Sequence, residues 1–274
     1  MGNSATVRGS LAPKYEFDRK VACINDSGAG AIKRTVTEYF KWDDRNVGSS
    51  NDKMKWLRFN LTPSQYVDEI VAHLWTGERS LVLPAVTSDG RFRLVDIMKD
   101  GKRLKISTDV DSDIRLLNKG ILNSSSGDFN RIYGNTRGFK WDSDSGDTST
   151  FNPTVTPTYG KKFNQLAYNN NFDKMYLDLG NTHSKYMEAN TMRGTLLNNF
   201  SCNEIICEVL DLNVLDVLDQ VDLVINNDPA QGESNDLWSG RYVVSKITTT
   251  VHNSQYSTWV TLNLKVFLAN HGDW

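Results

Sequence analysis

Apolar and polar residues alternate most regularly in the C-terminal part of the chain. From Thr258 to Val266, every second residue is apolar or β-branched, and the residues between them form a more polar face. Such period-two alternation is typical of a half-buried strand. The preceding stretch, Ser239–His252, is equally rich in Val, Ile, Thr and Tyr, and three polar residues link the two stretches. The pattern predicts a long β-hairpin.

A period near 3.6 residues predicts two helices much earlier in the chain. The first covers Ala29–Phe40, with its apolar residues on one side and its charged residues on the other. The second has a well-marked start, because Thr62 can act as N-cap, Pro63 takes the first helical position and Gln65 completes a capping box. Gly77 is the predicted C-cap of this helix.

Runs of aliphatic and β-branched residues predict further strands. The sequence Thr87-Ser-Asp-Gly90 predicts a tight turn between the first two of them. The polar stretch Asp43–Lys53 predicts an exposed loop. The remaining predicted strands are Ser80–Val86, Arg91–Ile97, Arg103–Ser107, Ile205–Val209 and Val217–Ile225.

The middle of the chain has a weaker pattern. Residues 123–152 are rich in Ser, Asp and Gly, which favours long loops or a surface insertion. Phe163–Leu179 has room for a strand or two, and Ser184–Asn199 predicts a helix interrupted near Gly194. From the residues alone we expect an α+β protein.

Composition and charge exclude several classes of protein. The 274 residues carry 31 Lys and Arg against 33 Asp and Glu, a net charge of -2, whereas a dedicated nucleic-acid binder is normally basic. No apolar run reaches the length of a bilayer span, and the N-terminus lacks the apolar segment of a secretory signal. The three cysteines, Cys23, Cys202 and Cys207, have no metal-type spacing and are interpreted as reduced thiols of a protein made in a cytoplasm.

Motifs for catalysis or metal binding are sparse. Asp109-x-Asp111-x-Asp113 resembles the start of a calcium loop, but Ile114 and Gly120 occupy the positions where an EF-hand has Gly and Glu. The acidic stretch Asp142–Asp147 fits either a cation loop or an ordinary turn. The four histidines are scattered, and no nucleophile has a recognisable catalytic partner. We therefore predict no enzyme activity, no cofactor and no metal.

Three segments, in the same order, resemble the central baseplate hub protein of contractile-tailed bacteriophages, which is related to the hub part of type VI secretion spike proteins. They are Trp56–Val71 with the hairpin after it, Asn199–Val209 continuing to Val217–Ile225, and the closing hairpin from Ser239. The resemblance implies a β-barrel-rich hub fold with a small mixed α/β subdomain and a C-terminal β-hairpin. The divisions that it implies are a helical and loop segment at 1–60, a mixed helix–hairpin subdomain at 61–122, a loop-rich insertion or middle β region at 123–183, and a β-barrel-like domain at 184–274.

The same resemblance implies a structural function in the virion. A protein of this kind is made in the host cytoplasm, forms a homotrimer between the tail tube and the central spike, contacts other baseplate proteins and leaves a lumen through which DNA passes. Exposed aromatic residues are candidate interface anchors, because large aromatic side chains contribute much of the binding energy at interfaces. The candidates are Trp141, Trp238, Trp259 and Trp274. The alternative is a tail-associated peptidoglycan hydrolase or glycan-binding module, with the Asn-, Asp- and aromatic-rich middle as its binding surface.

Overall fold

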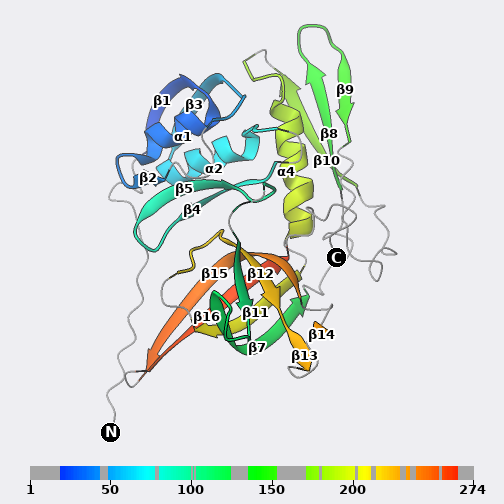
Figure 1. Cartoon of the computed structure of the whole chain (residues 1–274). Coiled ribbons are helices and arrows are strands. Elements are labelled where there is room, and N and C mark those ends of the chain that lie inside the picture. The colour runs from blue at the N-terminus through cyan, green and yellow to red at the C-terminus, as the bar shows by residue number, and fades with distance from the viewer. Residues whose placement is uncertain are drawn as a thin grey trace.

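The computed structural model has two parts, a layered part made of helices and small sheets and, beside it, a closed β-barrel (Figure 1). A long helix, α4 (Tyr186–Phe200), packs along the layered part and points toward the barrel. The α+β, β-barrel-rich fold predicted from the sequence is confirmed. The structure describes residues 19–43, 49–77, 80–99, 101, 103–124, 135–152, 171–178, 181–200, 203–210, 214–228, 233–234, 239–252 and 255–264.

The layered part begins with a two-stranded antiparallel sheet, β1–β3, that packs on two helices. A three-stranded sheet of order β2-β5-β4 covers the other side of these helices. A core cluster centred on Ile32, Tyr66 and Ile70 joins the two layers. The elements are β1 Lys20–Asp26, α1 Gly28–Val36, β2 Lys41–Asp43, β3 Met54–Leu61, α2 Pro63–His73, β4 Val82–Val86 and β5 Arg91–Asp96.

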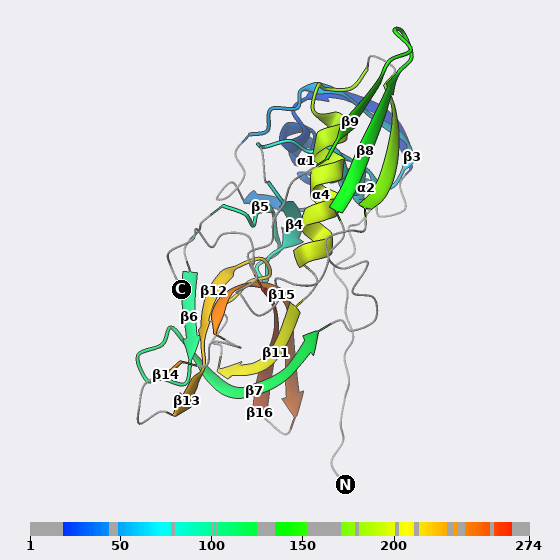
Figure 2. The same cartoon turned by 90° about the vertical axis from the view of Figure 1, so that its right-hand side faces the viewer.

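A third sheet, of order β10-β8-β9, lies against α4 on the far side from β1–β3 (Figure 2). β8 can approach α4 closely because Gly138 has no side chain: a Cβ there would lie 2.5 Å from Oγ1 of Thr191 and 3.0 Å from Cγ of Met187. The elements are β8 Asn135–Asp142, β9 Thr148–Phe151, β10 Asn171–Asp178 and α4 Tyr186–Phe200.

The barrel closes in the order β11-β16-β15-β12-β6-β7. β7 bends around β11 at Gly120, whose φ of +34° and close approach to the carbonyl of Ile206 exclude any side chain. The closing hairpin has the predicted faces, since Val260 and Leu262 are fully buried and Trp259 is half-buried. The elements are β6 Arg103–Ser107, β7 Ile114–Ser124, β11 Asn203–Leu210, β12 Gln220–Val224, β15 Gly240–His252 and β16 Gln255–Leu264, with a small pair β13 Asn226–Asp228 and β14 Glu233–Ser234 nearby.

Most predicted elements form where the periodicity placed them. α2 begins after Thr62 with both hydrogen bonds of the capping box, and β6 has the predicted bounds. β4 and β5 form the predicted hairpin across the turn Thr87–Gly90. Strands β11, β15 and β16 also match the sequence prediction.

Several details of the prediction are wrong. α2 ends at His73 with Leu74 as its cap, so Gly77 is not the C-cap. α4 continues without interruption through Gly194 to Phe200, because residues on both sides of the glycine are buried in a core shared with the barrel. Residues 135–152 form the β8–β9 hairpin where loops are expected.

The barrel draws its strands from two distant stretches of the chain. β6 and β7 lie within 61–122 of the predicted division, apart from the last two residues of β7, and the other four strands lie within 184–274. The segment 1–60 contains β1, α1 and β2 and nearly all of β3. The division of the chain into four domains therefore stays a prediction. In the structure, strands from different predicted domains share one sheet. Among the helices of the described ranges, none is long and apolar enough to cross a membrane.

Candidate assembly surfaces

The outer side of the β1–β3 sheet is apolar although it faces solvent. Val21 lies opposite Phe59 and Cys23 opposite Leu57 in the antiparallel register. The exposed fractions are 76% for Val21, 75% for Phe59 and 65% for Leu57, and Cys23 is also exposed. These four residues form what we call the β1–β3 face. Contiguous exposed apolar surface of this kind marks interaction sites more often than scattered apolar residues do.

Both sides of β1–β3 carry large apolar residues, which distinguishes this sheet from an ordinary surface hairpin. Trp56 and Arg58 alternate with the exposed residues of β3 and are buried against the helices, with 3% and 7% of their surfaces exposed. Trp56 donates its indole N–H to the backbone carbonyl of Asp26, and its own carbonyl accepts the hydroxyl of Tyr66. The inner side therefore holds the sheet on the helices. No described residue covers the outer side.

The β8–β10 sheet has a second apolar outer side. Gly138 and Tyr176 point toward α4, so the alternate residues Phe139, Trp141 and Met175 point away from it. Met175 is 86% exposed and Trp141 is 47% exposed, while Phe139 is half-buried. These three residues form what we call the β8–β10 face.

The two faces differ in the charges beside them. Exposed Arg19, Lys20, Lys53 and Lys55 lie along or next to the β1–β3 face, and β1 and β3 contain one acidic residue between them, Asp26. Asp26 forms an ion pair with Arg34 at 2.9 Å and is therefore neutralised locally. The β8–β9 turn carries the acidic residues Asp142, Asp144 and Asp147, and residues 141–152 contain no Lys or Arg. One face has a basic border and the other an acidic end.

The structure separates the tryptophans that the sequence analysis selected. Trp141 belongs to the β8–β10 face. Trp259 lies half-buried on the outside of the barrel, so the two do not share a surface. Trp238 and Trp274 lie outside the described residues. The role of all four as interface anchors stays a prediction.

The sequence analysis missed the β1–β3 face. The available signal is that Trp56, Leu57 and Phe59 interrupt the usual alternation of apolar and polar residues, which indicates a strand with two apolar sides.

The acidic stretches that resemble calcium loops have protein partners in the structure. Lys105 forms an ion pair with Asp109 at 2.9 Å, and its backbone N–H donates to the carboxylate of Asp113 at 2.7 Å. In the other stretch, Asp142 accepts the backbone N–H groups of Asp144 and Ser145, which is the bonding of a tight turn. Within the described ranges no group of three or more His, Cys, Asp or Glu residues is placed to hold a metal ion.

Two of the scattered histidines come together between α2 and α4. The ring of His73 stacks on Tyr186 with centroids 3.6 Å apart, and its Nδ1 lies 3.3 Å from the carbonyl oxygen of Tyr186. His183 donates Nε2–H to the carbonyl of His73 at 3.0 Å and accepts the backbone N–H of Lys185 at Nδ1. Burial lowers the pKa of His183, which favours the neutral ring that this bonding requires. The pair holds the start of α4 on the end of α2.

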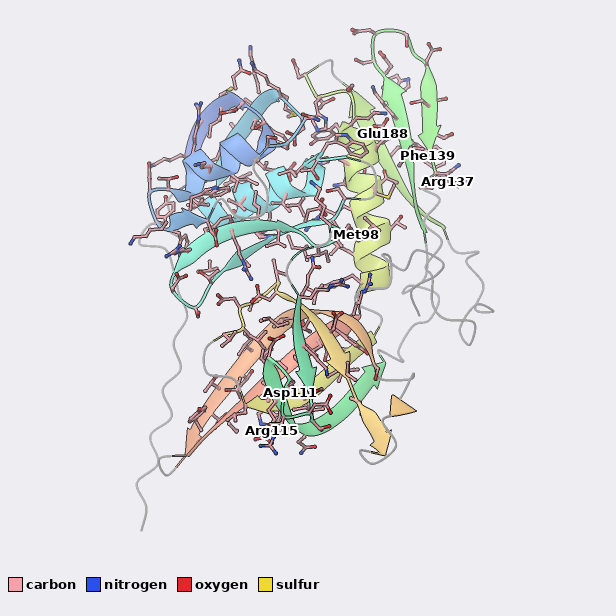
Figure 3. All side chains as sticks on the ribbon, viewed as in Figure 1. Met98, Asp111, Arg115, Arg137, Phe139 and Glu188 are labelled. Atoms are coloured by element: carbon pink, nitrogen blue, oxygen red, sulfur yellow. The ribbon has the colours of Figure 1, made fainter. Side chains whose placement is uncertain are left out.

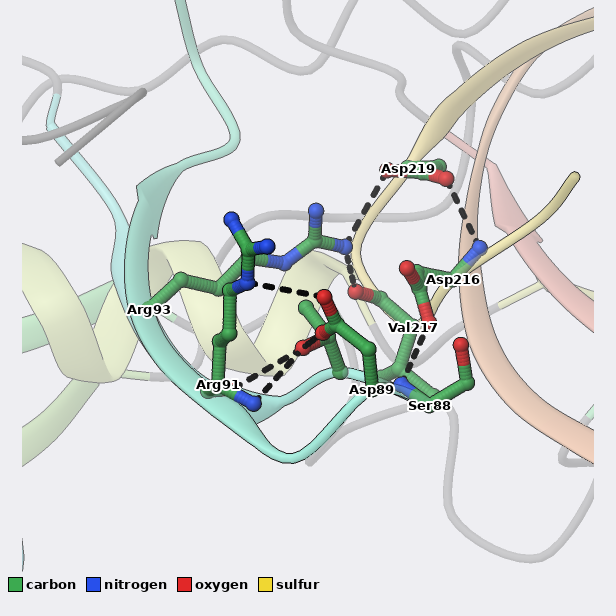
Figure 4. A network of polar contacts seen from close by, with 8 residues as sticks. Ser88, Asp89, Arg91, Arg93, Asp216, Val217 and Asp219 are labelled. Atoms are coloured by element: carbon green, nitrogen blue, oxygen red, sulfur yellow. Dashed lines mark hydrogen bonds and ion pairs between the residues drawn. The ribbon is translucent and has the colours of Figure 1, made fainter. Parts of the chain in front are cut away.

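A polar contact joins the β4–β5 hairpin to the barrel (Figure 4). Arg93, whose side chain is 4% exposed, donates to the carbonyl of Val217 and to the carboxylate of Asp219. The second oxygen of Asp219 accepts the backbone N–H of Asp216, and the carboxylate of Asp216 accepts the backbone N–H of Ser88 at 2.7 Å. This network connects the two parts of the molecule through the loop before β12.

The interior of the barrel is filled with side chains. Ile106, Ile205, Val221, Val260 and Leu262 are each fully buried within one core cluster. Burial raises the pKa of the Cys207 thiol to about 12, because the thiolate would lie in this apolar interior. The barrel of one copy is therefore a packed core and not a channel.

No model of a protein family and no curated protein matches the sequence. Among solved structures, the chain is similar to the tail protein from Neisseria meningitidis MC58, with a TM-score of 0.48, 9% sequence identity, and coverage of 92% of this chain and 72% of that one. It is also similar to the 43 kDa tail protein of prophage MuSo2 from Shewanella oneidensis, with a TM-score of 0.46, 10% identity, and coverage of 88% of this chain and 64% of that one. The chain thus spans less than two thirds of the length of the second protein.

Proposed function

We propose that this chain is a structural component of a phage tail, the baseplate hub that joins the tail tube to the central spike as a homotrimer. The observation that carries the proposal is the order of three hub-like segments in the sequence. In the fold, the first segment contains α2 and the β4–β5 hairpin, the second contains the barrel strands β11 and β12, and the third is the β15–β16 hairpin. The proposal places the chain in the same broad class as the two tail proteins described above.

The packed barrel determines where a passage for DNA would lie. Because the interior of one barrel is occupied by apolar side chains, DNA cannot pass through it. A lumen must then form between copies arranged around an axis, which is the arrangement that a cyclic trimer provides. The near-neutral net charge of -2 suits a lumen through which DNA slides, since many phosphate contacts would hold it.

The two exposed apolar faces support a role in assembly. Contiguous apolar surface of this kind is often a site of interaction. The described residues also favour structure over catalysis: the carboxylates of Asp109, Asp113 and Asp142 have protein partners, and the two buried histidines bind backbone groups. We infer a non-enzymatic protein of the virion.

The solution mass of the purified chain tests the proposal, measured by light scattering after size exclusion, with and without the tail tube and spike proteins encoded beside it. The expected result is a trimer, or a monomer that becomes a trimer when one of those proteins is added. A stable monomer whose mass does not change when either protein is added overturns the proposal. Cleavage of purified peptidoglycan by the chain, lost when one carboxylate is neutralised, would instead support the hydrolase.

A further inference from the structure

We propose that copies of this chain join by placing the β8–β10 face of one copy, together with its acidic β8–β9 turn, on the basic-bordered β1–β3 face of the next copy. The inference rests on the proposed function to the extent that it names the contact from which a ring of copies would be built. It identifies the partner of both faces as a second copy of this chain.

Among the described residues, neither face has a cover, although its apolar composition favours one. Val21, Leu57 and Phe59 expose about two thirds or more of their surfaces, and Met175 exposes 86%. Exposing these side chains to water raises the free energy of the protein, because burying apolar surface is favourable in proportion to its area. Association of the two faces would remove both from water at once.

The two faces lie on different sheets of one copy, with helices between them, so they cannot cover each other within it. The β1–β3 sheet packs on α1 and α2, α2 contacts α4, and the β8–β10 sheet lies on the far side of α4 (Figures 1 and 2). A contact between two different faces of identical copies is heterologous, and such contacts produce rings when the rotation closes. Each copy would then contact two neighbours.

Charge decides which face pairs with which. If two β1–β3 faces met, Arg19, Lys53 and Lys55 of both copies would be brought together. If two β8–β10 faces met, the carboxylates of Asp144 and Asp147 would face the same carboxylates of the other copy. Only the mixed pairing places opposite charges side by side, and like-charge contacts oppose wrong pairings. The acidic turn is therefore expected next to Lys55.

The one arginine on the described outer side of β8 does not oppose this pairing. The guanidinium of Arg137 lies over the ring of Phe139, 4.7 Å from its centroid, and Figure 3 places the two together on the sheet. Arg137 precedes Asp142 by five positions along β8, or about 17 Å at the usual rise of a strand. It therefore lies well away from the acidic turn that would meet the lysines.

The size of the faces predicts how assembly proceeds. A two-stranded sheet of this length offers on the order of a few hundred Å², against about 800 Å² for each partner in a stable complex of standard size. One such contact gives a weak pair, whereas a closed ring buries both faces of every copy. We expect monomers and closed rings in solution, with few open dimers.

Two single substitutions test the pairing, each at an exposed position. Phe59→Ser damages the β1–β3 face, and Trp141→Ser damages the β8–β10 face. Each variant alone is expected to lose the ring, with self-association weakened by roughly tenfold or more, as measured by sedimentation velocity over a range of concentrations. Val110→Ser is the matched control, since Val110 is 92% exposed on a loop of the barrel and belongs to neither face.

Mixing the two variants gives the decisive result. The intact β8–β10 face of Phe59→Ser can bind the intact β1–β3 face of Trp141→Ser, and the damaged faces then prevent closure. Because one contact gives a weak pair, the mixture should form a one-to-one dimer at high protein concentration, where neither variant alone forms a dimer. Dimers of either variant by itself would show that like faces pair, and would overturn the inference.

The outcomes also separate this inference from the proposed function. A wild-type ring that persists in both variants overturns the contact and leaves the hub proposal standing. A wild-type chain that stays monomeric at every concentration also overturns the inference, and its response to the tail tube and spike proteins then decides the hub proposal. As a control for folding, all three variants should have the same thermal unfolding midpoint as the wild type.

Discussion

The carboxylate of Asp52 connects three segments that are distant in sequence. It is fully buried, and it accepts the backbone N–H of Gly28 at 2.8 Å, the backbone N–H of Trp75 at 2.9 Å and the hydroxyl of Ser50 at 2.5 Å. Gly28 is the first residue of α1, where unpaired N–H groups favour a negative charge. A single side chain thus fixes the start of α1 and the segment after α2.

Replacing this carboxylate should destabilise the whole layered part. We expect Asp52→Ala to lower the free energy of unfolding by about 3 kcal/mol, because it leaves two buried N–H groups without partners. Urea denaturation followed by circular dichroism measures the change. Asp111→Ala, at an exposed position in the loop before β7, should leave the midpoint unchanged. Equal midpoints for the two variants would contradict the assigned role of Asp52.

The buried His183 predicts a dependence of stability on pH. Burial lowers the pKa of the folded ring below 6.5, and the nearby carboxylates of Asp52 and Glu188 offset this only in part. The unfolded chain therefore binds a proton at a higher pH than the folded chain does, so stability is present above pH 6.5 and is lost as the pH falls toward the folded pKa. The loss from this group is at most about 1.4 kcal/mol for each pH unit.

His183→Gln removes the titrating group and should flatten this profile. The measurement is the free energy of unfolding of both proteins at about pH 7 and at about pH 5, where the contributions of other groups cancel in the comparison. The wild type is expected to lose more stability than the variant. Identical losses of stability in the two proteins would show that His183 does not cause the pH dependence.

At the scale of elements, the junction between the β4–β5 hairpin and the barrel depends on two arginines with different surroundings. Arg93 is buried and binds the loop before β12, whereas Arg91 forms an ion pair with Asp89 in which both side chains are about half exposed. Their positions, two residues apart on β5, make them a matched pair.

Arg93→Met is expected to lower the free energy of unfolding by about 2 kcal/mol, since it leaves the carbonyl of Val217 and one oxygen of Asp219 without their donor. Arg91→Met should have no measurable effect, because water replaces a surface ion pair at little cost. Chemical denaturation of both variants provides the comparison. Similar losses for the two would mean that the barrel junction does not depend on Arg93.

Local patterns in the sequence predicted the elements whose signals are local. The capping box at Thr62 and the alternation after Thr258 each specify a short segment, and the structure has α2 and β16 there. The helix through Gly194 was obscured because the cost of a helical glycine, about 1 kcal/mol, is offset by burial of Leu196 in a core formed with distant residues. Asp52 was likewise assigned to an exposed loop, because its partners lie on other segments.

The candidate site shows the same division between local and distant information. Trp141 could be selected as an exposed aromatic from its polar surroundings. The β3 half of the β1–β3 face has a local signal in Leu57 and Phe59, but the whole face could not be predicted, since Val21 and Phe59 become neighbours only through strand pairing across α1. That the barrel includes β6 and β7 also depends on pairing with strands about a hundred residues later.

For the whole molecule, the proposed contact between copies predicts a dependence on salt. Raising the ionic strength from about 0.1 M to about 1 M shortens the Debye length from about 10 Å to about 3 Å, which screens Lys55 from the acidic turn. The association rate, followed by light scattering after dilution and reconcentration, should fall. A variant carrying Lys55→Gln and Asp144→Asn should associate more slowly at low salt and depend less on salt. Equal salt dependence of the wild type and the variant would show that these charges do not take part in the contact.

The late pairing of β6 and β7 also has a consequence for how the protein is made. These strands share only a short parallel contact with each other, and they complete their pairing with β12 and β11. At a synthesis rate of about 5–20 residues per second, roughly ten seconds pass between the emergence of β7 and that of β11. During that interval Ile106, Ile114 and Leu116, all buried in the finished barrel, have no interior to enter. A ribosome that stalls between β10 and β11 would thus release an aggregation-prone chain, and chaperones of the cell have a defined stretch to protect.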